Sequence, residues 1–212
     1  MVARKSLRRA SLRVWGDLGY TVMTTPEAIA SAVDRLSRIA HSLQFAQGLN
    51  PAQWEALRYL ARANKYSTTP GILAEYLGTT KGTVSQTLIA LESKGFVERI
   101  RCKADRRKIR LGLTDAGQAM LESDPIRRIE TATSELPASE QQNLHTAITA
   151  IVEELCARKE GPEFGVCGAC CHLDRVAGPK ACAGSGRCGL TDESLLPEEL
   201  TQICVNYETA KN

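Results

Sequence analysis

Residues 69–113 read TPGILAEYLGTTKGTVSQTLIALESKGFVERIRCKADRRKIRLGL, and this stretch decides the fold. Thr69 followed by Pro70 is a typical helix start, because a hydroxyl group caps the first turn and proline already has the backbone shape of the first helical position. Apolar residues then continue at helical spacing until Gly78. Because glycine favours the end of a helix, the sequence predicts a short helix that stops there.

A second helix is predicted to begin at the pair Thr79-Thr80 and to end at Gly95. Its inner face is apolar, with residues spaced by four and then three positions, and its outer face carries short hydrogen-bonding groups that suit base edges in a major groove. The inner residues are Val84, Leu88 and Leu91. The residues expected to contact DNA are Thr80, Lys81, Thr83, Ser85 and Gln86. Two helices joined at a glycine therefore predict a helix-turn-helix.

Two strands are predicted after this helix, over residues 96–102 and 108–114. Apolar residues alternate with arginine or glycine along both segments, as expected for strands with one buried face. By this alternation, Ile109, Leu111 and Leu113 share a face, and Ile100 is expected to point inward from the first strand. The two strands predict a small β-hairpin, or wing.

The hairpin is strongly basic, with seven basic residues and one acidic residue between positions 99 and 110. Such a concentration of positive charge favours phosphates and the narrow minor groove. Arg106 and Arg107 at the tip are the expected minor-groove contacts, and Asp105 is expected to orient an arginine through a paired hydrogen bond. The wing is therefore the second expected DNA contact.

Five motifs follow one another in this part of the chain. They are QWEAL (53–57), TVS (83–85), LESKGFVER (91–99), DRRK (105–108) and LTDAG (113–117). In this order they resemble the MarR family of bacterial winged-helix regulators, over about residues 27–159. The resemblance implies a mainly helical winged helix-turn-helix with a small β-wing, which binds double-stranded DNA at a near-palindromic operator as a homodimer, more often as a repressor.

Three regions are expected along the chain: a basic N-terminal arm (1–24), the winged helix-turn-helix and dimerisation domain (25–160), and a cysteine-rich appendage (161–212). Apolar residues at helical spacing predict one amphipathic helix from Pro26 to about Gln47 and another after Pro137. The MarR resemblance implies that these two helices interlock across a two-fold axis.

The overall composition limits the possible classes of protein. The net charge is +3 and 43% of the 212 residues are hydrophobic, which supports an ordinary core. Basic residues outnumber acidic ones before residue 115 and are outnumbered beyond it, as expected for a polyanion partner of the first half. No apolar run approaches 18 residues, so we expect no membrane span and a cytoplasmic location. None of the three histidines stands in a catalytic arrangement, and an enzyme is not expected.

Six of the eight cysteines lie in the appendage, which has too little apolar surface to fold on burial alone. In a reducing compartment this favours metal or redox chemistry over structural disulfides. Cys167 and Cys170 form a C-x-x-C turn that can grip one centre, while Cys188 and Cys204 supply single thiolates. One pair with two isolated cysteines fits an iron-sulfur cluster at least as well as structural zinc.

The motifs C-x-x-C (167–170), CGLT (188–191) and CVNYE (204–208) resemble the small subunits of benzylsuccinate synthase. That resemblance implies a 4Fe-4S cluster held by Cys167, Cys170, Cys188 and Cys204. The extra thiols Cys171 and Cys182, and the nearby His172, leave the fourth ligand open. Zinc and a thiol switch without metal remain alternatives. The roles of Cys102 and Cys156 are not assigned by any motif.

Because the appendage follows the last predicted dimer helix, we expect its redox or metal state to alter the spacing of the recognition helices and hence DNA affinity. The alternative is a regulator that senses a small aromatic ligand and has a purely structural zinc tail.

Overall fold

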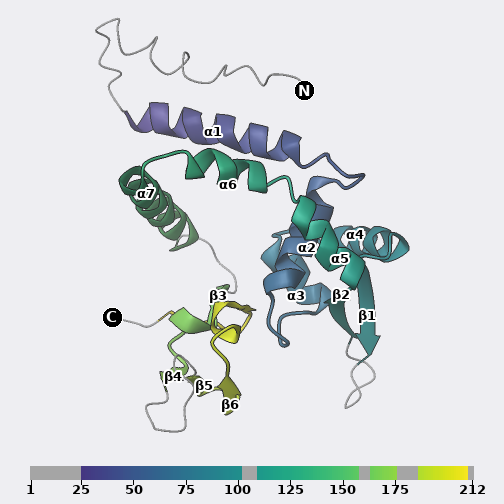
Figure 1. The fold of residues 1–212 in the computed structure, drawn as a ribbon. Helices are drawn as coiled ribbons and strands as arrows, with labels where there is room; N and C mark the ends of the chain where they lie inside the picture. Colours follow the sequence, from purple (N-terminus) through teal and green to yellow (C-terminus); the bar gives the residue numbers. More distant parts are fainter. Residues whose placement is uncertain (1–24, 102–108, 158–162, 176–185, 210–212) are drawn as a thin grey trace, which may run out of the picture. The chain divides into compact units, whose positions relative to one another are not determined.

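The computed structural model describes residues 25–101, 109–157, 163–175 and 186–209 (Figure 1). Residues 1–40 and 41–212 form two separate units. The helices are α1 (Pro26–Leu43), α2 (Pro51–Arg62), α3 (Pro70–Tyr76), α4 (Lys81–Ser93), α5 (Asp115–Met120), α6 (Arg127–Ser134) and α7 (Ala138–Ala157). The strands are β1 (Val97–Arg101), β2 (Ile109–Leu113), β3 (Gly165–Val166), β4 (Leu173–Arg175), β5 (Gly186–Cys188), β6 (Glu193–Leu195) and β7 (Ile203–Cys204). The 3₁₀ turns are η1 (Leu121–Ser123), η2 (Cys167–Ala169) and η3 (Glu199–Thr201).

Helix α1 is amphipathic, as its spacing predicts, but none of its residues is buried. Ile29, Val33, Leu36 and Ile39 are between 43% and 51% exposed. Helix α7 carries a comparable set, because Leu144, Ile148, Ile151, Val152 and Leu155 are between 39% and 65% exposed. Both helices therefore present apolar side chains that the described chain leaves accessible.

The core of the second unit lies among α2, α3, α4 and the hairpin. Helix α2 begins with a capping box, in which the Asn50 side chain accepts from the Gln53 amide and the Gln53 side chain accepts from the Asn50 amide. Trp54 and Leu57 of α2 are fully buried. They pack with Leu73, Val84, Leu88 and Leu91, so the inner face predicted for the second helix is confirmed.

Strands β1 and β2 pair antiparallel, with Val97 opposite Leu113 and Arg99 opposite Leu111. Val97 and Leu111 are buried, which identifies the inner face of the hairpin. The expectation that Ile100 points inward is wrong, because Ile100 is 47% exposed. Its strand parity places it with Glu98 on the outer face, and Arg99 takes the inner position, where it pairs with Glu92 of α4 at 2.9 Å.

The tail forms two small sheets, one from β3 and β7 and one in the order β4-β5-β6. It is also joined to the winged helix. Ile203 of β7 is 5% exposed and belongs to the same hydrophobic core as α2 and α4. Its carbonyl oxygen accepts from the Asn64 amide at 2.9 Å, and the ring of Phe164 meets Tyr76 of α3 edge to face. Apolar contact with the winged helix therefore helps to anchor a tail that was expected to depend on a metal centre.

Candidate functional sites: the recognition helix and the cysteine pocket

Helix α4 is held so that its polar face stays accessible. Thr80 is its N-cap, since the Thr80 hydroxyl oxygen accepts from the Thr83 amide at 3.2 Å. The Thr80 and Thr83 hydroxyl oxygens also lie 2.9 Å apart. Thr80, Lys81, Thr83 and Gln86 are exposed, and Ser85 is half-buried. The structure thus brings the predicted helix residues together on one side of α4, while Val84 and Leu88 anchor the opposite side.

The tip of the wing, with Asp105, Arg106 and Arg107, lies outside the described residues, as do Cys102, Cys182 and the N-terminal arm. Within the described strands, Arg101 is exposed and Arg110 is half-buried. The described part of the hairpin, up to Arg101 and from Ile109 onward, therefore carries basic side chains.

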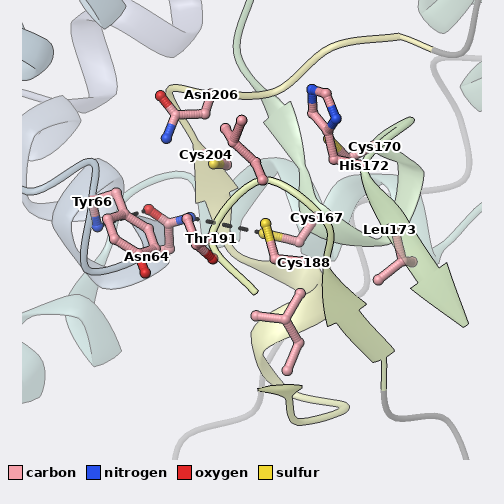
Figure 2. Close-up of a pocket in the computed structure, with 12 residues that line it drawn as sticks. Asn64, Tyr66, Cys167, Cys170, His172, Leu173, Cys188, Thr191, Cys204 and Asn206 are labelled. Atoms are coloured by element: carbon pink, nitrogen blue, oxygen red, sulfur yellow. Dashed lines mark hydrogen bonds between the residues drawn. The ribbon is translucent and has the colours of Figure 1, made fainter. Parts of the chain in front are cut away.

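All four predicted cysteine ligands line one pocket (Figure 2). They come from three parts of the tail. Cys167 begins η2, and its carbonyl oxygen accepts from the Cys170 amide at 3.2 Å, which forms the tight C-x-x-C turn that the spacing predicts. Cys188 ends β5 and Cys204 ends β7. The full lining is Asn64, Tyr66, Cys167, Cys170, His172, Leu173, Cys188, Leu190, Thr191, Leu195, Cys204 and Asn206.

Two of the pocket cysteines perturb each other's pKa values. The Cys167 thiol donates a hydrogen bond to Cys204, which lowers the pKa of Cys204 well below its ordinary value and raises the pKa of Cys167. Asn64 adds to this arrangement, because its Nδ2 lies 3.8 Å from the Cys167 sulfur (Figure 2). A metal is bound by the thiolate form of cysteine, so this pair of thiols would have to lose its protons before it could hold a metal.

The spacing of the thiols bears on which centre fits. Zinc holds sulfur at about 2.3 Å, so four tetrahedral ligands would lie about 4 Å apart. Among the described residues, the trio of possible metal ligands within 4.8 Å of one another is Cys171, His172 and Glu208 instead. The four pocket cysteines do not form such a trio, although Cys167 and Cys204 are in contact with each other.

The trio Cys171, His172 and Glu208 was not predicted as a site. The Cys171 sulfur and the His172 Nε2 lie 3.9 Å and 3.4 Å from the same Glu208 oxygen, and the Cys171 amide donates to the Glu208 carbonyl oxygen at 2.9 Å. Cysteine, histidine and glutamate are all zinc ligands. Cys171 and Glu208 are exposed and His172 is half-buried, so this trio is a more open candidate site than the cysteine pocket.

Sequence reasoning missed the contribution of the winged helix to the pocket. Asn64 and Tyr66 lie in the loop between α2 and α3, and Asn64 is separated from Cys167 by 103 positions. The hydroxyl of Tyr66 donates to Glu193 of β6, and Lys65 forms an ion pair with the same carboxylate at 2.5 Å. No local pattern marks these residues, because their importance arises only once the tail has docked.

Comparisons with known proteins agree with the fold. The model of the MarR family matches residues 47–108. The HTH-type transcriptional repressor YetL of Bacillus subtilis is 33% identical over 99 residues, which are 45% of this chain and 59% of YetL. The chain thus spans about three fifths of that relative's length. No described helix is both long and apolar enough to cross a bilayer.

Two solved structures are similar in fold at 23% sequence identity. A mutant form of MepR from S. aureus has a TM-score of 0.52, with 62% of this chain and 99% of MepR covered. Streptococcus pneumoniae FabT in complex with DNA has a TM-score of 0.50, with 63% of this chain and 96% of FabT covered. The matched family segment contains α2, α3, α4 and β1, and it ends before the tail. The chain therefore has the winged-helix fold of these two structures, and its residues 47–108 match the MarR family.

Proposed function

We propose that this chain is a DNA-binding transcriptional repressor whose DNA affinity responds to an iron-sulfur centre in its tail. The observation that carries the first part is α4, a capped helix with a buried apolar face and an exposed face of Lys81, Thr83 and Gln86. Such a helix can enter a major groove and donate or accept hydrogen bonds at base edges. YetL carries the name of a repressor, and FabT was solved with DNA. The proposal assigns no enzymatic activity to the chain.

The DNA-binding form in this proposal is a homodimer that acts in the cytoplasm on a near-palindromic operator. The accessible apolar residues of α1 and α7 support the dimer, because large apolar surfaces of this kind commonly mark protein interfaces. Two copies related by a two-fold axis would present two recognition helices, and such a pair reads two half-sites.

The centre in this proposal is a 4Fe-4S cluster held by Cys167, Cys170, Cys188 and Cys204. Support comes from the convergence of these four thiols, contributed by three separate parts of the tail, on one pocket. Such a cluster, when bound, supplies sensitivity to oxidation and to loss of iron. The four cysteines of this chain would hold it, beside apolar walls from Leu173 and Leu195.

The second candidate is a MarR-type regulator that senses a small aromatic ligand and has a purely structural zinc tail. The trio Cys171, His172 and Glu208 favours this reading, because its ligand atoms already lie within 4.8 Å of one another. In that case zinc would bind beside the cysteine pocket and the pocket thiols would remain free.

The deciding experiment is anaerobic purification of the full-length chain with metal and sulfide analysis, an absorption spectrum, and affinity for DNA before and after removal of the metal. DNA duplexes are first selected from a random-sequence pool by each form of the protein. We expect a brown protein with iron and sulfide and at least a tenfold difference in DNA affinity between the two forms. Equal affinities would remove the sensing role and leave the tail as a structural element.

Two substitutions distinguish the sites. Cys188→Ser should abolish iron and sulfide incorporation, because it removes a pocket thiol. Cys171→Ser should leave the iron content unchanged, since Cys171 does not line the pocket. The structural zinc site would be favoured over the cluster if the wild-type protein were colourless and contained zinc, and if Cys171→Ser lost that zinc while Cys188→Ser kept it.

A further inference from the structure

The tail reaches the DNA-binding unit through the loop between α2 and α3, residues 63–69. Cys204 is flanked by two residues that are bonded to this loop. Ile203 accepts from the Asn64 amide at 2.9 Å, and the Val205 amide donates to the Ser67 hydroxyl oxygen at 2.9 Å. The backbone on both sides of one expected cluster ligand is therefore attached to the same short loop.

Asn64 and Ser67 form the buried part of this attachment. Asn64 is 8% exposed and Ser67 is fully buried. The Asn64 Oδ1 accepts from the Ser67 hydroxyl at 2.7 Å and from the Tyr66 amide at 3.1 Å, while its Nδ2 is directed at the Cys167 sulfur. Buried polar groups tolerate the loss of a partner poorly, so a shift of either cysteine changes the hydrogen bonds of this loop.

The other end of the loop is bonded to the DNA-binding elements. The Thr68 carbonyl oxygen accepts from the Leu111 amide of β2 at 2.7 Å. Thr69, the next residue, caps α3 by accepting from the Ile72 amide. The loop thus contacts the wing through one residue and begins the first helix of the helix-turn-helix with the following one.

We propose that Asn64 and Ser67 are positioning residues that transmit the state of the cysteine pocket to the wing and to α3 within one chain. This inference rests on the proposed function for its effect on DNA. When the centre is lost, Cys167 and Cys204 are free to shift, and the hydrogen bonds of Asn64 and Ser67 rearrange. Residues 68 and 69 then move, and with them the parts of β2 and α3 to which they are bonded. The route bypasses the dimer helices.

The test compares full-length wild type with Ser67→Ala, which removes the hydroxyl that binds Val205 but leaves every cysteine in place. The control is Thr201→Ala, because the Thr201 hydroxyl donates within the tail, to the Glu198 carbonyl oxygen. Iron-loaded and chelator-stripped protein are titrated with the selected DNA duplex. Ser67→Ala should bind as much iron as wild type. The ratio of its DNA affinities in the iron-loaded and stripped forms should be less than a third of the wild-type ratio, while Thr201→Ala should keep the wild-type ratio. An unchanged ratio in Ser67→Ala would overturn the proposal.

Should Ser67→Ala fail to fold, Asn64→Asp serves instead, because it keeps an acceptor oxygen and loses the amide that faces Cys167. Hydrogen exchange at the Leu111 amide supplies a readout independent of DNA. Its rate should change severalfold on iron removal in wild type and not in the variant. Equal exchange rates at Leu111 in iron-loaded and stripped wild type would contradict the proposed coupling. If the exchange rate changes on iron removal but the two forms bind DNA equally well, only the proposed function is contradicted.

Discussion

At the scale of single residues, Gly117 explains a feature that sequence patterns alone leave puzzling. Glycine weakens a helix, yet Gly117 lies inside α5. A Cβ atom there would come within 2.0 Å of the Phe96 carbonyl oxygen. That same oxygen accepts from the Thr114 amide at 3.1 Å, and the Thr114 hydroxyl donates to the Gly95 carbonyl oxygen. The close approach of α5 to the start of the wing therefore requires glycine.

We expect Gly117→Ala to lower the free energy of unfolding by about 1–3 kcal/mol, because the backbone must shift to admit a methyl group. The matched control is Gly71→Ala in α3, where an added Cβ meets nothing within 4 Å. That variant should be neutral or more stable, since alanine favours helices. Urea unfolding followed by circular dichroism measures both. A neutral Gly117→Ala would show that α5 can move away freely.

Gln86 tests the recognition helix one side chain at a time. It is exposed on α4, and Gln86→Ala should weaken binding to the selected duplex by about 1–3 kcal/mol while leaving stability unchanged. Ser93→Ala, also exposed but in the last turn of α4, should bind as wild type does. Equal affinity for Gln86→Ala and wild type at fixed salt would remove Gln86 from the DNA contacts.

At the scale of elements, local signals predicted most of the winged helix. Thr69 and Thr80 cap the helices α3 and α4 where the sequence predicted these helices to begin, and Gly95 has a positive φ of 74° after α4. These features depend on a few neighbouring residues, which is why they can be read from sequence. The turn at residues 167–170 is likewise a local feature, and the C-x-x-C spacing predicted it.

Contacts between distant segments could not be predicted in this way. The ion pair between Arg58 and Asp124 joins residues 66 positions apart, at 2.7 Å and 2.8 Å. Neither residue belongs to a periodic pattern that marks a partner. Ile203 likewise joins the core from a segment whose composition indicated little apolar burial. The alternation along β1 predicted the wrong face for a related reason, because Arg99 shares the face of Val97 and pairs there with Glu92, which is seven positions away on α4.

Asp124→Ala tests the first of these contacts. Asp124 is 7% exposed, and its removal leaves the half-buried Arg58 without a carboxylate and with the Gln44 side chain as its acceptor, so stability should fall by about 1–3 kcal/mol. Glu122→Ala is the control, because the Glu122 and Arg127 side chains are 71% and 52% exposed. Exposed ion pairs contribute little, and that variant should unfold at the wild-type urea midpoint. Equal midpoints for both variants would show that burial does not strengthen the Arg58 pair.

At the scale of the whole molecule, the accessible apolar residues of α1 and α7 are the feature that a single chain does not account for. Each helix contains the periodic spacing of a buried face, yet the described chain leaves those residues 39% to 65% exposed. Exposing this much apolar surface in water is unfavourable, and a second copy that covers it removes the cost.

Ile148→Glu in α7 tests this assembly directly. Ile148 is 43% exposed, so the substitution should leave the fold of the chain intact while placing a charge inside the proposed interface. We expect light scattering to give the mass of a monomer, and DNA affinity to fall more than tenfold because two half-sites can no longer be bound together. Gln142→Glu, an exposed change on the same helix, should remain dimeric. A dimeric Ile148→Glu would move the interface away from α7, and a monomeric wild type with full DNA affinity would show that one recognition helix is enough.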